Sequence, residues 1–189
     1  LKGGERVLDV CCGIGDLALM FHRRKPKPIE VIASDFTPEM LVIAKQKADK
    51  AGVPLPLAAA DALHLPFPDA SFDVVSVGYG VRNFQDIDAG LRELARVLKP
   101  GGRLAILEAT PARGLIGRFA NWYINRVVPW LGNVLTGSRD KAYSYLADSI
   151  QLFPDANALK ARMEQAGLKD VRFRKLNLGT MAIHVGVRD

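Results

Sequence analysis

Near the amino-terminal end stands Val7-Leu8-Asp9-Val10-Cys11-Cys12-Gly13-Ile14-Gly15-Asp16, an apolar run that leads directly into two closely spaced glycines. An apolar run bounded by glycine predicts a buried strand, and the residues that follow predict a helix. Glycines at 13 and 15 remove the Cβ atoms that would hold a ligand away from the backbone, and the free N–H groups at a helix start bind polar atoms. The sequence therefore predicts a ligand-binding loop between the first strand and the first helix.

Short apolar runs alternate with helical patterns along the chain, as is typical of βαβ units and of a parallel sheet with both faces covered. The strands expected from these runs are 6–11, 29–34, 55–60, 72–78 and 102–108. Helices are expected over 15–24, from Thr37 to Ala51-Gly52, over 86–98 and over 155–166, and two closing strands over 171–178 and 181–187. We predict a doubly wound α/β fold with a mostly parallel, seven-stranded sheet.

The expected helix ends follow from the residues that stand there. Thr37 carries a hydroxyl that can cap the second helix, and Pro38 suits the first helical position. Lys99-Pro100-Gly101-Gly102 is expected to end the helix over 86–98 and to turn the chain into the fifth strand. After that strand, a helical insertion is expected over about 111–152, where it would cover the open edge of the sheet.

Composition points to one globular domain over residues 1–189, with a formal net charge of +6. The charge favours acidic partners, such as an anionic membrane surface or nucleic acid, although a solvated basic surface is the simpler explanation. The basic clusters lack the interleaved aromatic residues that stack on bases, so no nucleic acid is expected. Polar residues interrupt the most apolar tract before it could span a bilayer, so a cytoplasmic protein is expected. Because residue 1 is not methionine, we expect a further amino-terminal segment.

The residue types that most often hold metals are few and scattered. Cys11 and Cys12 are the only cysteines and are adjacent, so they can form neither a disulfide framework nor a spaced metal motif. This cysteine usage favours a reducing compartment. His64 and His184 have no partner ligands near them in sequence, and we expect them at the surface or in the core. No metal site is predicted.

Two acidic residues end the next two predicted strands. Asp35 lies twenty residues beyond Gly15, where a carboxylate can accept hydrogen bonds from both hydroxyls of a ribose. An adenosine-containing cofactor is therefore expected. The spacing Gly13-x-Gly15-x-x-Ala18 also satisfies the fingerprint of dinucleotide-binding enzymes, so these features leave a nicotinamide-dependent oxidoreductase open. Asp61 ends the third strand, where an adenine amino group would lie.

Three later motifs resemble those of the class I S-adenosylmethionine-dependent methyltransferases, which have a Rossmann-like fold: Ala60-Asp61-Ala62, the run 65–73 and the run 96–102. In that family matching aspartates bind the ribose and the adenine, and the glycine turn holds the methionine portion. The resemblance therefore implies S-adenosylmethionine as the cofactor, in place of a nicotinamide dinucleotide. The cofactor-binding residues that it implies are Asp9, Cys11, Gly13, Ile14, Gly15, Asp35, Phe36, Asp61, Ala62 and Gly78.

The resemblance narrows at three further stretches. The run Gly78-Tyr79-Gly80-Val81-Arg82-Asn83-Phe84, the run 96–108 and the run 143–154 resemble the demethylmenaquinone and ubiquinone-precursor C-methyltransferases. This resemblance covers nearly the whole chain. It implies methyl transfer to a ring carbon of a prenylated quinol precursor in menaquinone or ubiquinone biosynthesis, with naphthoquinol and benzoquinol acceptors both open. The alternatives are a methyltransferase of another small molecule and a cofactor-binding subunit without turnover.

The loop after the fourth predicted strand carries the candidate catalytic residues, because ligands bind at the carboxyl edge of such sheets. The resemblance places Arg82 and Asn83 in the reactive pocket. An arginine cannot serve as a neutral base, so we expect Arg82 to stabilise a developing phenolate or to order a water that carries the proton. A purely structural Arg-Asn turn is the alternative. Tyr79 either shapes the same pocket or simply packs there, and Asp16 either caps its helix or contacts the methionine ammonium.

The expected insertion carries Trp122, Tyr123 and Trp130 among arginine and asparagine residues. These aromatic residues either pack as an ordinary core or form a hydrophobic lid for a prenyl tail that also touches the bilayer interface. A lipid-soluble acceptor favours the lid, and a peripheral contact with the inner face of the membrane is then expected. Exposed apolar surface on the insertion also makes a homodimer a reasonable expectation.

Overall fold

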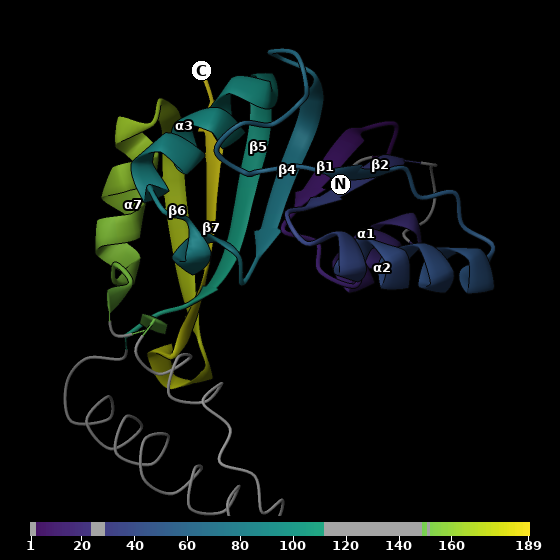
Figure 1. The fold of residues 1–189 in the computed structure, drawn as a ribbon. Coiled ribbons are helices and arrows are strands. Elements are labelled where there is room, and N and C mark those ends of the chain that lie inside the picture. Colours follow the sequence, from purple (N-terminus) through teal and green to yellow (C-terminus); the bar gives the residue numbers. More distant parts are fainter. Residues whose placement is uncertain (1–2, 24–28, 112–148, 151) are drawn as a thin grey trace, which may run out of the picture.

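The computed structural model describes residues 3–23, 29–111, 149–150 and 152–189. Within these ranges strands and helices follow one another in the predicted order (Figure 1). The strands are β1 Arg6–Val10, β2 Glu30–Asp35, β3 Leu57–Ala59, β4 Phe72–Gly78, β5 Leu98–Ala109, β6 Leu168–Leu176 and β7 Met181–Arg188. The helices are α1 Asp16–His22, α2 Pro38–Ala51, α3 Ile87–Val97 and α7 Ala156–Gln165, with short 3₁₀ turns at η1 Val81–Asn83 and η3 Asn177–Gly179.

The described strands form one seven-stranded sheet in the order β3-β2-β1-β4-β5-β7-β6. β1 to β5 pair in parallel, and the crossover connections that parallel neighbours need are mostly helices. β7 runs antiparallel between β5 and β6, so β6 and β7 form the expected closing hairpin. The doubly wound, mostly parallel α/β fold predicted from the sequence is therefore confirmed.

Both faces of the sheet are buried, because side chains alternate between the two faces along each strand. In β1, Val7 belongs to a core with α1 and α2, whereas Leu8 and Val10 belong to a core with α3 and α7. At most 2% of the surface of these three residues is exposed. Figure 1 shows α3 and α7 together on one side of the sheet and α1 and α2 on the other. This double burial explains why the strands are continuous apolar runs in the sequence.

Acidic side chains cap two of the helices. Asp86 and Asp155 each accept a hydrogen bond of 2.9 Å from the backbone N–H three residues further on, at the starts of α3 and α7. Thr37 is the N-cap residue of α2, as expected, but the prediction that its side chain caps the helix is wrong, because the Thr37 hydroxyl makes no cap hydrogen bond. The backbone N–H of Thr37 instead donates to Asp35 Oδ1 at 2.9 Å. The start of α2 is therefore fixed by a carboxylate at the end of β2.

β5 begins earlier than the sequence predicts. It starts at Leu98, directly after α3, instead of at Gly102, because Leu98 pairs with Phe72 at the amino end of β4. The register of the pairing between β4 and β5 then shifts between Phe72 and Val74. The expected turn residues 99–102 lie in this irregular part of β5. A tertiary pairing thus draws residues with turn chemistry into the sheet.

The expected helical insertion of about 111–152 lies almost wholly outside the described residues, and so do Trp122, Tyr123 and Trp130. The single domain with a helical lid therefore stays a prediction. In the part of the chain that is described, no helix combines the length and the apolar character needed to cross a bilayer.

Candidate active site

The carboxyl ends of β1, β2, β3 and β4 open into a cavity of about 510 Å³. In the sheet, β1 lies between β2 and β4, so the order of the strands reverses at this point. Ligands of doubly wound sheets bind at such a switch point. The lining includes most of the residues expected to bind the cofactor: Cys11, Gly13, Asp35, Phe36, Asp61, Ala62 and Gly78. It does not include Asp9, Ile14 or Gly15.

Asp35 is the last residue of β2, and its carboxylate is held from two sides. Gly13 N donates to Oδ2 at 2.8 Å, and Thr37 N donates to Oδ1 at 2.9 Å. One carboxylate thus joins the glycine turn after β1 to the start of α2. Each carboxylate oxygen has more than one lone pair, so both can still accept a hydroxyl from a ligand in the cavity.

Asp61 lies on the loop after β3 and lines the same cavity. Its Oδ1 accepts a hydrogen bond of 2.9 Å from Leu63 N, and His64 Nδ1 lies 3.9 Å from its Oδ2. Phe36 follows Asp35 directly, and it is 75% exposed although it borders the cavity. A large apolar ring left open beside two carboxylates is a surface on which a flat base can stack.

The two glycines of the turn have different structural roles. Gly13 has φ of 53°, and a Cβ placed there would meet no atom within 4 Å, so the turn borders open space. Gly15 has φ of 81°, and a Cβ there would lie 3.0 Å from Ala44 Cβ in α2. Gly15 therefore allows the turn to pack closely on α2. It is also the N-cap of α1, which has no side-chain cap bond. Of the two roles left open for Asp16, the cap is therefore wrong, since its carboxylate binds Lys47, and the contact with a methionine ammonium stays a prediction.

Asp9 is a buried residue of β1, with 1% of its surface exposed. Ser76 Oγ donates a hydrogen bond of 2.7 Å to Asp9 Oδ1, whereas Oδ2 has no partner within the described part of the chain. Burial raises the pKa of Asp9 to about 7, and the charge of Asp35 adds to this rise. Asp9 therefore does not border the cavity, and it titrates near neutral pH.

Cys11 borders the cavity, and its thiol stays protonated at ordinary pH. Burial, together with the negative charges of Asp35, Asp9 and further carboxylates, raises the pKa of Cys11 to about 12. A thiol in that state is a poor nucleophile and a poor metal ligand. Among the residues that the structure describes, no three side chains of metal-binding type lie close enough to hold an ion. His64 is exposed and His184 is buried in the core, whereas the sequence left open which of the two positions each histidine takes.

The loop after β4 separates the expected catalytic residues. Tyr79 and Asn83 line the cavity, but Arg82 does not. The Arg82 guanidinium turns to Glu108 near the end of β5, with Nη1 2.5 Å from Oε1, and lies 5.7 Å from the centre of the Tyr79 ring. Tyr79 Oη donates to Met181 Sδ of β7 at 2.7 Å. Glu108 is not among the expected site residues, although a charged residue at the end of a buried strand is a signal that the sequence carries.

Further residues line the cavity without having been expected there: Thr37, Met40, Ala60, Leu63, Gly80, Phe84 and Gln85. Most of them contribute apolar surface or backbone, which no motif distinguishes in a sequence. Gly80 is an exception, since a Cβ there would lie 2.5 Å from Cys11 Cβ. This close approach brings the loop after β4 against the end of β1, and it shapes one wall of the cavity.

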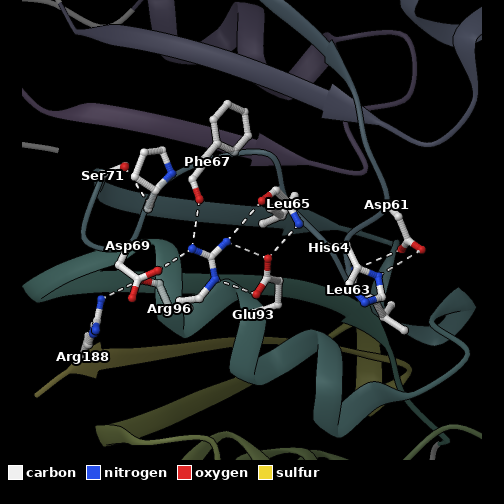
Figure 2. Close-up of polar contacts among 11 residues, drawn as sticks. Asp61, Leu63, His64, Leu65, Phe67, Asp69, Ser71, Glu93, Arg96 and Arg188 are labelled. Carbon is white, nitrogen blue, oxygen red and sulfur yellow. Dashed lines mark hydrogen bonds and ion pairs between the residues drawn. The ribbon is translucent and has the colours of Figure 1, made fainter.

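A polar network centred on Arg96 holds the loop between β3 and β4 (Figure 2). The guanidinium binds Glu93 through Nε at 2.8 Å and Nη2 at 2.7 Å, and binds Asp69 through Nη1 at 2.5 Å. It also donates to the backbone carbonyls of Leu65 and Phe67, at 3.2 and 2.9 Å. Glu93 in turn accepts a hydrogen bond of 2.7 Å from Leu65 N. A single arginine of α3 therefore fixes much of this loop to the helix.

Curated proteins match nearly the whole chain. The demethylmenaquinone methyltransferase of Thermus thermophilus is 47% identical over 188 residues, which cover 99% of this chain and 84% of that protein. The ubiquinone/menaquinone biosynthesis C-methyltransferase UbiE of Ralstonia pickettii is 42% identical over 188 residues, which cover 100% of this chain and 77% of that protein.

Solved structures share the fold at lower identity. The phosphoethanolamine N-methyltransferase 2 of Haemonchus contortus, in complex with S-adenosyl-L-methionine, has a TM-score of 0.75 at 16% identity. That match covers 100% of this chain, which spans about half, 49%, of the length of that protein. A SAM-dependent methyltransferase of Aquifex aeolicus has a TM-score of 0.68 at 21% identity and covers 99% of this chain and 83% of its own. At these identities the likeness concerns the fold alone.

A family model also matches nearly the whole chain. The model described as the ubiE/COQ5 methyltransferase family matches residues 1–188. Its extent agrees with that of the relative that is 47% identical over 188 residues. Both matches run through the glycine turn, the two aspartates of the cavity and the loop after β4. The chain therefore belongs to the ubiE/COQ5 methyltransferase family.

Proposed function

We propose that the chain transfers a methyl group from S-adenosylmethionine to a ring carbon of a prenylated quinol, in the biosynthesis of menaquinone or ubiquinone. The names of its relatives and its family support this function. The observation that carries the proposal is the convergence of Asp35, Phe36 and Asp61 on one cavity at the switch point of the sheet. These side chains come from the ends of two different strands, and together they match the needs of an adenosine.

The cavity fits S-adenosylmethionine in size and in chemistry. Its volume of about 510 Å³ lies within the roughly 300–1,000 Å³ of small-molecule sites. Asp35 would hold the two ribose hydroxyls, Asp61 the adenine amino group, and Phe36 one face of the base. The open space beside Gly13 admits the methionine portion next to the backbone of the turn. When bound, the cofactor supplies a methyl group that its sulfonium has already activated.

The acceptor ring would lie against the cavity wall that Tyr79 and Asn83 form. Methyl transfer is an in-line displacement, so the chain mainly has to align two reactants and keep water out. A ring carbon becomes nucleophilic when a neighbouring hydroxyl loses its proton. The Arg82 cation, which lies 5.7 Å from the centre of the Tyr79 ring and outside the lining, would stabilise the resulting negative charge across this wall. Arg82 stays charged because a guanidinium does not lose its proton in proteins, whereas the Asn83 amide can hold the hydroxyl or a water that takes the proton.

The test is an assay of the full chain with demethylmenaquinol and with a ubiquinol precursor, in which mass spectrometry follows a labelled methyl group from S-adenosylmethionine. We expect transfer to the ring of at least one quinol, with release of an equal amount of S-adenosylhomocysteine. Calorimetry with S-adenosylmethionine and with NADH separates the alternatives. Binding of S-adenosylmethionine without transfer would indicate another acceptor or a subunit without turnover, and binding of NADH alone would indicate an oxidoreductase.

A prenylated acceptor resides in the lipid bilayer, so the proposal includes a peripheral contact with the inner face of the membrane. The formal net charge of +6 supports it, because anionic lipids attract a basic surface. The aromatic residues of the expected insertion suit the bilayer interface as well. Co-sedimentation with anionic vesicles should show binding that weakens as salt is added, and no binding would remove this part of the proposal. The homodimer expected from the sequence is tested separately, by light scattering of the full chain.

A further inference from the structure

Glu108 is a carboxylate in an unusual place. It is the last residue but one of β5 and is completely buried, with 0% of its surface exposed. Its Oε1 accepts hydrogen bonds from Arg82 Nη1 at 2.5 Å and from Ala109 N at 2.8 Å, and its Oε2 accepts one of 3.2 Å from Arg82 N. The side chain thus joins β5 to η1, at the edge of the sheet where the cavity lies.

Stability is a weak reason for a buried ion pair at this position. Taking two charges out of water has a large desolvation cost, and an apolar pair of similar volume is often at least as stable. The place of the pair is more informative. Arg82 lies two residues after Gly80 and directly before Asn83, and both Gly80 and Asn83 line the cavity. A buried carboxylate that binds the residue between them points to a need for a fixed orientation there.

The Arg82 guanidinium depends on Glu108 for its direction. The arginine side chain is only 14% exposed, and its Nε is buried without a partner in the described part of the chain. The ring of Tyr79, at 5.7 Å, attracts the cation but does not select one rotamer. An arginine has many rotamers to lose. Glu108 restricts them by binding the backbone and the guanidinium of the same residue.

We infer that Glu108 is the positioning residue of Arg82 in the methyl transfer proposed above, on which this inference rests. Glu108 is too deeply buried to touch the acceptor. It sets where the η1 turn stands and where the positive charge of Arg82 points. The guanidinium does not line the cavity itself, but it lies 5.7 Å from the centre of the ring of Tyr79, which does. Its positive charge would act on the acceptor site across this wall, and no reorganisation is needed during the reaction.

The kinetic experiment compares Glu108→Gln, Arg82→Met and the double variant. Glu108→Gln should lower kcat about 10- to 100-fold, as misplacing a catalytic group by about 1 Å does. The KM for S-adenosylmethionine should stay within about twofold of the wild-type value, because the substitution leaves the groups proposed to bind the cofactor unchanged. The double variant should be slower than Arg82→Met by much less than the loss in Glu108→Gln alone, since Glu108 acts on the reaction mainly through the Arg82 side chain. A wild-type kcat in Glu108→Gln, or losses that add fully in the double variant, would overturn the inference.

Hydrogen exchange gives a readout that needs no acceptor. The backbone N–H of Arg82 should exchange faster in Glu108→Gln, while the amides of β1 keep their wild-type rates and show that the variant is folded. Unchanged exchange at Arg82 would overturn the inference. If the wild-type chain methylates neither quinol, the proposed function fails, and the exchange rates still show separately whether Glu108 fixes the backbone of the η1 turn at Arg82.

Asp73→Asn is the matched control. This carboxylate lies near the amino end of β4, far along the strand from the cavity, and binds Lys99 Nζ with both oxygens at 2.9 Å. Its loss should lower thermal stability but leave kcat and the exchange of Arg82 N–H unchanged. A slower reaction in Asp73→Asn would show that any lost ion pair has the same effect, and the inference would fall.

Discussion

Asp9 and Ser76 face each other in register on the neighbouring strands β1 and β4, and the Ser76 hydroxyl donates a hydrogen bond of 2.7 Å to the Asp9 carboxylate. This bond favours the ionised form, but burial outweighs it and raises the pKa of Asp9 from 3.8 to about 7. The ionised carboxylate is therefore unfavourable in the folded protein, and stability must depend on pH.

The sign of that dependence follows from the raised pKa. Below about pH 4 Asp9 is protonated in both states; between about pH 4 and pH 7 the unfolded chain ionises first, so the free energy of unfolding falls. Above about pH 7 both states are ionised and the loss is complete. Asp9→Asn should remove this loss, and its advantage over wild type should grow by roughly 2–3 kcal/mol between pH 5 and pH 8.

Urea unfolding of both proteins at the two pH values measures this growth. Asp49→Asn is the control, because that carboxylate is exposed on α2 and pairs only with Lys45 in the described structure. Its difference from wild type should not change with pH. An advantage of Asp9→Asn that shrinks as the pH rises would contradict the raised pKa.

Asp35→Ala removes the carboxylate proposed to hold the ribose. Hydrogen bonds to a charged group contribute roughly 1.5–3 kcal/mol, so the Kd for S-adenosylmethionine should rise about 10- to 150-fold. Calorimetry measures the Kd directly. Asp35→Asn keeps one oxygen that can accept from Gly13 N or Thr37 N, so its Kd should lie between those of the wild type and Asp35→Ala. Wild-type affinity in Asp35→Ala would place the ribose elsewhere.

Gly80→Ala tests the close approach of the loop after β4 to the end of β1. The backbone angles of Gly80, φ −107° and ψ −33°, suit any residue, so the conflict is purely steric. The new Cβ would lie 2.5 Å from Cys11 Cβ and 2.7 Å from its Sγ. We expect the free energy of unfolding to fall by about 1–3 kcal/mol.

Adding Cys11→Gly to Gly80→Ala should restore most of the lost stability. The second change removes both conflicting atoms, and glycine suits the φ of 55° at position 11. Gly78→Ala is the control for the loop, since its Cβ would lie at an ordinary 3.7 Å from the nearest atom. Thermal unfolding checks all four proteins. A double variant no more stable than Gly80→Ala would show that the loss has another cause.

Arg96→Met removes the guanidinium that holds the loop between β3 and β4. Glu93, Asp69 and the carbonyls of Leu65 and Phe67 then lose a donor, so the free energy of unfolding should fall by roughly 1–3 kcal/mol. Hydrogen exchange over 65–69 should become faster. Arg92→Met, on the exposed face of the same helix, should leave both measurements near wild type. Unchanged exchange over 65–69 would show that the loop keeps its structure without Arg96.

Much of the sheet could be predicted because burial on both faces turns each strand into a short apolar run. β4 occupies the expected residues 72–78, and the bounds of β1 and β2 differ from expectation by one residue. The start of β5 could not be predicted, since Lys99-Pro100-Gly101-Gly102 has turn chemistry and only the pairing of Leu98 with Phe72 draws it into the sheet. That pairing is a tertiary contact, which local propensity does not contain.

The candidate site could be predicted where a residue type itself implies a ligand, as with Asp35, Asp61 and the open turn at Gly13. The direction of a side chain is another matter. The Arg82 guanidinium does not line the cavity but binds Glu108, which lies 26 positions further along the chain on the next strand. Sequence distance does not reveal such a contact, because it depends on which strand lies beside which.

β7 follows β6 in the chain, yet it lies between β5 and β6 and pairs with both. As a nascent polypeptide leaves the ribosome, the five parallel strands can assemble while synthesis continues, but β6 has to wait for the residues after it before it gains a neighbour. Until then, the edge of β5 is an open template for strands of other chains. A message truncated before the codon for Met181 would therefore yield an aggregating product, even though every proposed cofactor contact had already been translated.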